Sequence, residues 1–161
     1  MRASTGQLTP GVETQATMVV IAAAAFAIDA LYVKLDDMLD PGVRCVAKKR
    51  VVETLKTSLD LGNRTDRWTK SIKELFDLRD ELVHFRGVDR EPQPHPTGKS
   101  QVSVESALYT VERAVWAVDF AHEVLTVAYK EPRPRHKALV AWAESAPHVP
   151  AHLDEWRRGA E

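Results

Sequence analysis

A long apolar run near the amino terminus limits what this chain can fold into. Met18 to Ile28 contains no polar side chain, and Asp29 then interrupts the run before it reaches the roughly 20 residues that a membrane-spanning helix needs. The stretch before it holds one basic residue, Arg2, and one acidic residue, Glu13, whereas a secretory signal begins with clear positive charge. We therefore expect a buried helix in a soluble, cytoplasmic protein with no membrane partner.

Composition and charge exclude several classes of protein. The 161 residues suit one domain with a core of its own. The 22 basic and 23 acidic residues give a formal net charge of −1, so any binding of RNA must come from a local patch. The single cysteine, Cys45, excludes an internal disulfide and suits a reducing cytosol. Because no second cysteine is present and the histidines are scattered, we expect no metal site.

Proline and glycine divide the chain into helices. We expect four long helices, over about residues 13–40, 44–61, 65–85 and 103–129. Thr65 and Ser103 are suitable N-caps. A short helix over about 135–144 and an amphipathic piece around Trp156 follow, and no strand-like alternation of useful length is present. The sequence predicts an all-α fold, an antiparallel helical bundle of about four long helices with short C-terminal helices.

Three segments follow from this pattern. Residues 1–12 have no periodicity and should form a flexible N-terminal arm. Residues 13–129 contain the bundle. Residues 130–161 form a C-terminal helical extension, because Pro132 and Pro134 break the fourth long helix.

One positive side chain falls on the apolar face of the third expected helix. At about 100° per residue, the apolar residues of this helix form a single stripe: Trp68, Ile72, Leu75, Phe76, Leu82 and Val83. Arg79 lies in the middle of that stripe. Burying an unpaired guanidinium has a large free-energy cost, so Arg79 needs a carboxylate, a carbonyl, a cavity or a partner surface. Both a structural ion pair and a functional group in a cleft are consistent with this position.

His84 follows Arg79 by five residues, which is about 140° around a regular helix. The two side chains therefore cannot converge on one straight helix. Convergence requires a distorted helix end near Gly87 or a second copy of the chain, so a functional pair predicts a homodimer. Asp80 lies four residues before His84 and is placed to orient its imidazole.

Two further polar residues lie on helix faces. Asp29 shares a face of the first helix with Tyr32 and Asp36, and it is either the partner of Arg79, a supporting carboxylate of the same site, or a solvent-facing acid. His122 lies on the apolar line of the fourth expected helix. We interpret it as a hydrogen-bonded core residue rather than a ligand.

Two compact basic runs are candidates for phosphate contacts. One is Lys48–Arg50, and the other contains Lys130, Arg133, Arg135, His136 and Lys137. Such runs are also common on solvated surfaces. The four tryptophans are dispersed over separate helices, which indicates packing rather than a platform for stacking bases.

The segment from Leu75 to Phe85 resembles the signature of the HEPN family. In that family an arginine is followed by a polar residue and, after four to six intervening positions, by a histidine. Here Asp80 takes the polar position, and four residues separate Arg79 from His84. The motif comes late on the third long helix, before a loop and another long helix, as in that family. The resemblance covers residues 13–129.

Many HEPN proteins are metal-independent ribonucleases that act as dimers, with the two motifs meeting at the interface. The resemblance implies that His84 is the general acid or base that acts on the RNA 2′-hydroxyl or the leaving 5′-oxygen. Arg79 would hold the scissile phosphate and stabilise the developing charge, and Asp80 would assist. Such chemistry leaves a 2′,3′-cyclic phosphate and a 5′-hydroxyl, and it needs no cofactor.

Three functions remain open at this point. The first is an endoribonuclease in a toxin–antitoxin or phage-defence setting, with an antitoxin protein as a partner. The second is a catalytically inactive HEPN-like dimer that binds RNA, a nucleotide or a protein, and the third is an interaction domain in which Arg79 and Asp29 only form a buried pair. HEPN toxins paired with a nucleotidyltransferase antitoxin often carry a tyrosine two positions after the histidine. This chain has Arg86 there, which would supply a further phosphate contact.

Overall fold

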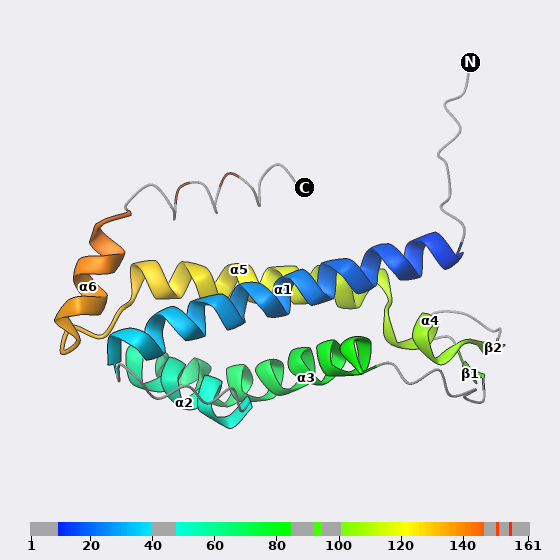
Figure 1. Ribbon diagram of the computed structural model, residues 1–161, viewed down its shortest axis with the longest axis horizontal. Coiled ribbons are helices and arrows are strands. Elements are labelled where there is room, and N and C mark those ends of the chain that lie inside the picture. Colours follow the sequence, from blue (N-terminus) through cyan, green and yellow to red (C-terminus); the bar gives the residue numbers. More distant parts are fainter. Residues whose placement is uncertain are drawn as a thin grey trace, which may run out of the picture.

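Three long helices form the frame of the molecule. The computed structural model describes residues 10–39, 48–84, 92–94 and 101–146, together with residues 151 and 155. The long helices are α1 (Pro10–Leu39), α3 (Thr65–Val83) and α5 (Val111–Lys130), shown in Figure 1. The shorter elements are α2 (Lys48–Ser58), a 3₁₀ turn (Gly62–Arg64), α4 (Val104–Leu108), α6 (Lys137–Glu144), and strands β1 (Gln93–Pro94) and β2 (Gln101–Val102), which pair antiparallel. The predicted all-α fold is confirmed.

The long helices alternate in direction along the chain. α1 and α5 lie side by side and run the same way, and α3 runs against both (Figure 1). α2 is short and packs beside α1 and α3, so the described residues give three long helices rather than the expected four. The turn after α2 uses Gly62 at φ 51°, a left-handed conformation that glycine adopts at little cost.

One continuous hydrophobic core holds these helices together. From α1, Ile21, Ile28 and Leu35 are fully buried. Trp68 of α3 packs edge-on against Phe120 of α5, with ring centroids 5.9 Å apart. The expected apolar stripe of α3 is therefore buried along most of its length. Its last member, Val83, is instead 61% exposed because α3 ends there.

The expected helix over 103–129 is divided in two. Ser103 caps α4 as predicted, accepting a hydrogen bond from the backbone N–H of Ser106 at 3.2 Å. The chain then leaves the helix at Tyr109, whose carbonyl accepts a hydrogen bond from Thr17 Oγ1 at 2.7 Å. Thr110 starts α5 as its N-cap. The helix is therefore interrupted where the carbonyl of Tyr109 bonds to Thr17 of α1.

Thr65 does not have its expected role as an N-cap. It is the first residue of α3, and its hydroxyl donates to the carbonyl of Gly62 at 3.3 Å. The N-cap position belongs to Arg64, which provides no side-chain cap. The 3₁₀ turn before α3 explains the difference, because the chain is already helical when it reaches Thr65.

α1 is long and apolar enough to cross a membrane over Val12–Leu39, by length and composition alone. The core helix of a soluble protein and a signal sequence pass the same test. Here one side of α1 packs into the core, but a second side carries exposed apolar residues such as Val19 and Phe26.

Candidate functional site

Arg79 is held by carboxylates from two helices. Its Nη1 donates to Oδ2 of Asp29 on α1 at 2.7 Å. Its Nε and Nη2 both donate to Oδ1 of Asp80, at 3.1 and 2.8 Å. The ring of Phe76 lies 4.4 Å from the guanidinium carbon, a cation–π distance. Of the alternatives for Asp29, the structure therefore shows the ion pair with Arg79, whose side chain remains 14% exposed.

The Arg79 guanidinium keeps some hydrogen-bonding capacity. Arginine has five N–H donors, and three of them are used in the bonds to Asp29 and Asp80. One N–H on Nη1 and one on Nη2 have no acceptor among the described residues. The group of Arg79 and two ionised carboxylates carries a formal charge of −1, so it attracts a phosphate less strongly than a lone arginine would.

His84 lies just beyond the end of α3. Its backbone has left the helix, with φ −103° and ψ 22°, while its N–H still donates to the carbonyl of Asp80 at 2.9 Å. Its side chain is exposed. Asp80, which we expected to orient the imidazole, binds Arg79 through Oδ1. The role of Asp80 toward His84 stays a prediction.

The other predicted RNA-binding residues do not join this site within one chain. Arg86 lies outside the described residues. Lys130 ends α5, and Arg133 and Arg135 follow it, beside the start of α3 (Figure 1). With its 19 residues, α3 is about 28 Å long, so these basic residues and His84 are at opposite ends of the bundle.

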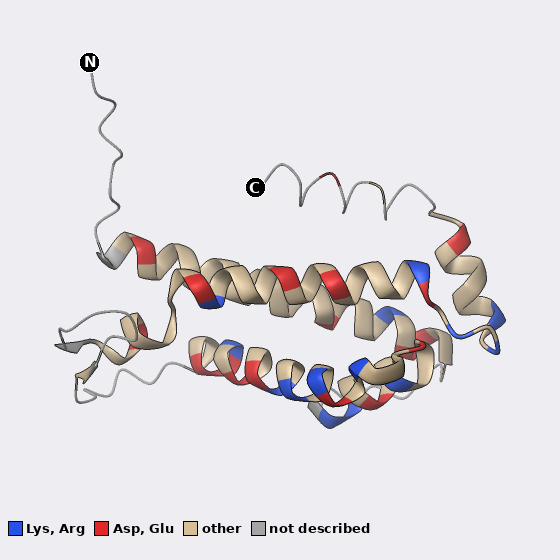
Figure 2. Cartoon of the chain, turned by 180° about the vertical axis from the view of Figure 1, so that it is seen from behind, with Lys and Arg blue, Asp and Glu red and all other residues tan. Residues whose placement is uncertain are grey.

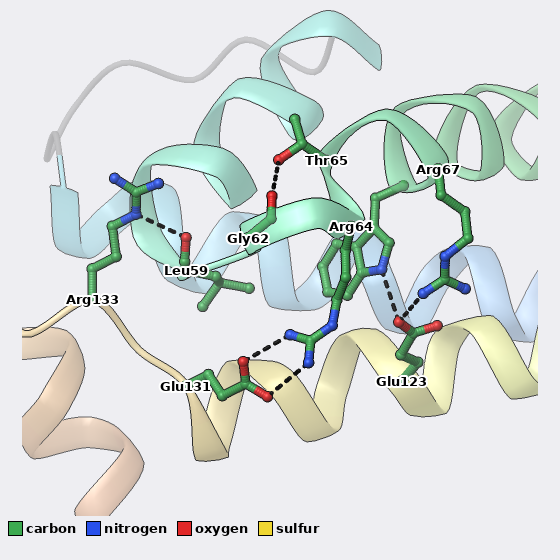
Figure 3. Close-up of polar contacts among 9 residues, drawn as sticks. Leu59, Gly62, Arg64, Thr65, Arg67, Glu123, Glu131 and Arg133 are labelled. Atoms are coloured by element: carbon green, nitrogen blue, oxygen red, sulfur yellow. Dashed lines mark hydrogen bonds and ion pairs between the residues drawn. The ribbon is translucent and has the colours of Figure 1, made fainter.

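Arg133 has a structural contact of its own. Its Nε donates to the carbonyl of Leu59 at 2.8 Å (Figure 3). Its backbone N–H donates to the carbonyl of Ser58 at 2.9 Å. Arg135 donates to the ring of His136 at 3.1 Å. Arg133 therefore fastens the segment after α5 to the end of α2.

A cluster of ion pairs between α3 and α5 was missed by sequence reasoning (Figure 3). Arg64 makes two parallel hydrogen bonds to Glu131, at 2.7 and 3.1 Å. Glu123 Oε1 accepts from Arg67 and from the indole N–H of Trp68. Burial acts to raise the pKa of Glu123, but the hydrogen bonds from Arg67 and Trp68 and the positive charges of Arg67 and Arg64 outweigh it, so the pKa is lowered.

Asp36 forms a second such network near the C-terminal end of α1. It is 6% exposed and accepts hydrogen bonds from Arg50 at 3.2 Å, Thr54 at 3.1 Å and Tyr32 at 3.4 Å. Burial, together with the charge of Asp36, raises the pKa of Tyr32. Arg50 of the first basic run is thus a structural ion-pair partner, whereas neighbouring Lys49 is 86% exposed.

The described residues line grooves on the surface, among them a charged one and an apolar one. One, of about 480 Å³, has charged walls that include Lys73, Asp77 and Arg113. The other, of about 400 Å³, is almost wholly apolar and lies between α1 and α5, with Val20, Ala27 and His122 in its lining. His122 is only 7% exposed, which agrees with its interpretation as a core residue.

Neither the distribution of charge nor comparison with known proteins assigns a function to this site. Basic and acidic residues are interspersed along α3, without a broad surface of one sign on that helix (Figure 2). Among the described residues, no group of three or more His, Cys, Asp or Glu side chains is arranged to hold a metal ion. In comparisons with known proteins, no family model, no curated protein and no solved structure matches this chain.

Proposed function

We propose that this chain is a HEPN-like, metal-independent endoribonuclease whose site is built from Arg79, Asp80 and His84. The observation that supports it best is the geometry at the end of α3. A guanidinium fixed by Asp29 and Asp80 retains two N–H donors, five residues before an exposed histidine. Together with the sequence resemblance, this supplies a phosphate-binding group and a proton-transfer group on one helix end.

The proposed reaction is an internal transfer at phosphorus. His84, as a neutral base, removes the proton of the 2′-hydroxyl, whose oxygen attacks the adjacent phosphorus. The 5′-oxygen leaves and takes a proton from an acid, which is a second His84 in a dimer. Arg79 stabilises the charge on the non-bridging oxygens through its remaining N–H donors. The products are a 2′,3′-cyclic phosphate and a 5′-hydroxyl.

A homodimer is part of the proposal because the two groups diverge on one chain. The side chains of Arg79 and His84 point about 140° apart on an ideal helix. α3 ends at Val83, and the hydrogen bond that His84 makes there runs from its backbone N–H to Asp80, not to Arg79. In a dimer, His84 of a second copy would act together with Arg79 of the first. The toxin or phage-defence setting, the antitoxin partner and the cytoplasmic location rest on the resemblance and composition alone.

A second candidate function is the inactive HEPN-like module, and one observation favours it. Arg79 is mostly buried and is bound by two carboxylates, so the local charge opposes a phosphate. In that case Arg79 would fasten α3 to α1, and the dimer would bind RNA, a nucleotide or a protein without cleaving it.

RNA cleavage in the presence of a chelator separates the two candidates. Wild type, His84→Ala and the control His136→Ala, at the opposite end of the bundle, are incubated with single-stranded RNA, and product ends are analysed. The ribonuclease proposal expects cyclic phosphate ends from wild type and the control, and a loss of at least about a hundredfold in His84→Ala. Intact RNA with a folded, dimeric wild type would reject catalysis and leave the binding module.

A further inference from the structure

The outer side of α1 carries a regular row of exposed large apolar residues. Val12, Val19, Phe26 and Val33 are 49%, 68%, 54% and 45% exposed. They recur every seven residues over about 32 Å of helix. The core-facing residues of α1, such as Ile28, lie on the other side. A large apolar row of this kind usually marks an interaction surface.

Exposed alanines complete this row. Ala16, Ala23 and Ala30 are also exposed and alternate with the larger residues at steps of four and three. This is the spacing of the seam of a coiled coil, in which each residue packs between residues of a facing helix. We call these seven residues the α1 seam.

We propose that the α1 seam binds the α1 seam of a second copy of this chain, in antiparallel orientation. In the register that places Ala23 opposite Phe26, Ala16 meets Val33 and Ala30 meets Val19. These six layers each pair one large residue with one alanine, which fills space evenly. Val12, the seventh seam residue, comes opposite Asp37 instead. A parallel pair would instead stack Phe26 on Phe26 and alanine on alanine, giving crowded layers next to empty ones.

Charge complementarity selects the same register. Glu13 and Lys34 are exposed on the same flank of the seam, one near each end. In the antiparallel register Glu13 of each copy comes beside Lys34 of the other, within about 3 Å along the axis, so two ion pairs close the interface. The same register brings Asp37, which is exposed, within about 1.5 Å of Glu13 along the axis, so Lys34 lies beside two carboxylates at each rim.

A second copy fits the seam better than a membrane surface does. Helices that lie on anionic membranes carry several Lys or Arg residues on their polar face. In the described residues of α1, Lys34 is the basic residue, and it is accompanied by Glu13 and Asp37. The ion pairs of Asp36 and Asp29 hold α1 to α2 and α3, so moving α1 into a membrane core would break both pairs.

The symmetry of this dimer bears on the Arg79 site. An antiparallel two-fold pair puts the same flank of both helices on the same side. Asp29 lies on the flank toward α3, three residues after Phe26 and four before Val33. Both Asp29–Arg79 pairs therefore border one side of the dimer. Any part that the two Arg79 sites play in RNA cleavage rests on the proposed function, whereas the interface itself is argued from the α1 seam alone.

Analytical ultracentrifugation of the full chain tests the interface. We expect wild type to be a dimer at micromolar concentration and Phe26→Glu to be a monomer with unchanged helicity, because Phe26 is half exposed. Ala23→Glu is a second variant with the same expected outcome. Val115→Glu is the control, since Val115 is 56% exposed but lies on α5, and it should remain dimeric.

The orientation has its own test in charge-exchanged variants. Glu13→Lys and Lys34→Glu each place like charges together in an antiparallel homodimer and should raise the dissociation constant about tenfold. Mixing the two variants restores both ion pairs in a heterodimer, which should regain wild-type affinity. A monomeric wild type, including one that co-floats with phosphatidylglycerol vesicles, overturns the proposal, as does a dimer that survives Phe26→Glu and Ala23→Glu. RNA cleavage is not a readout here, so a failure of the ribonuclease proposal would leave this result unaffected.

Discussion

Asp29 of α1 and Arg79 of α3 are 50 positions apart in the chain and are joined by a hydrogen bond of 2.7 Å. The other oxygen of Asp29 is buried and has no hydrogen-bond partner among the described residues. Arg79 also binds Asp80. The stability of the interface between α1 and α3 should therefore depend on this guanidinium.

We predict that Arg79→Ala lowers the free energy of unfolding by about 2 to 4 kcal/mol, because it leaves two partly buried carboxylates without their cation. Urea denaturation of both proteins measures the change. A double-mutant cycle with Asp29→Ala should give a favourable coupling of about 1 to 3 kcal/mol. The control Lys49→Ala, in an exposed pair with Glu53, should change stability by less than about 0.5 kcal/mol. Unchanged stability in Arg79→Ala would contradict a structural role for the pair.

The start of α5 gives a second prediction. Thr110 caps α5 by accepting a hydrogen bond from the N–H of Arg113, so Thr110→Ala should lower the free energy of unfolding by about 1 kcal/mol. Thr110→Ser keeps the oxygen and should recover most of that loss. Thermal denaturation compares the three proteins. Equal losses in both variants would assign the effect to the threonine methyl group rather than to the cap.

The helix pattern could be predicted from sequence, but the helix breaks set by tertiary contacts could not. Proline, glycine and the apolar spacing locate α1, α3 and α6 to within a few residues. The break at Tyr109 has no local signal, because it depends on the bond from Thr17 on α1. The sequence-based helix wheel placed Arg79 on the apolar stripe, and the ion pair with Arg79 was one of three alternatives for Asp29.

The ion pairs between α3 and α5 were beyond sequence reasoning for a different reason. Glu123 and Trp68 are 55 positions apart, and exposed-looking acids and bases are common on any helix. A pair at such separation depends on how α3 and α5 sit against each other. The proposed roles of Asp80 and His84 are a similar case, because catalysis depends on angstrom-scale geometry in a dimer.

The lowered pKa of Glu123 gives a prediction for pH dependence. In the unfolded chain this carboxyl has its ordinary pKa of about 4.5. Its folded pKa is lower, so its stabilising contribution is fully present above the unfolded pKa and is lost as pH falls through the folded pKa. Glu123→Gln should therefore be less stable than wild type at pH 7, and the difference should shrink in acid. Urea denaturation across the pH range measures it, and a difference that stays constant down to pH 2 would contradict the ionic contribution.

The separation of the basic end from His84 gives a prediction for RNA length. Lys130 and Arg135 are exposed and lie about 28 Å away along α3, so a dinucleotide bound at His84 cannot reach them, whereas a long RNA can. The double variant Lys130→Ala/Arg135→Ala should weaken binding of a long RNA severalfold and flatten its salt dependence, while dinucleotide cleavage stays unchanged. Lys70→Ala, an exposed charge on α3 outside both basic runs, serves as the control for loss of a charge. Equal effects on both substrates would place the contact elsewhere and remove these two residues from the RNA path.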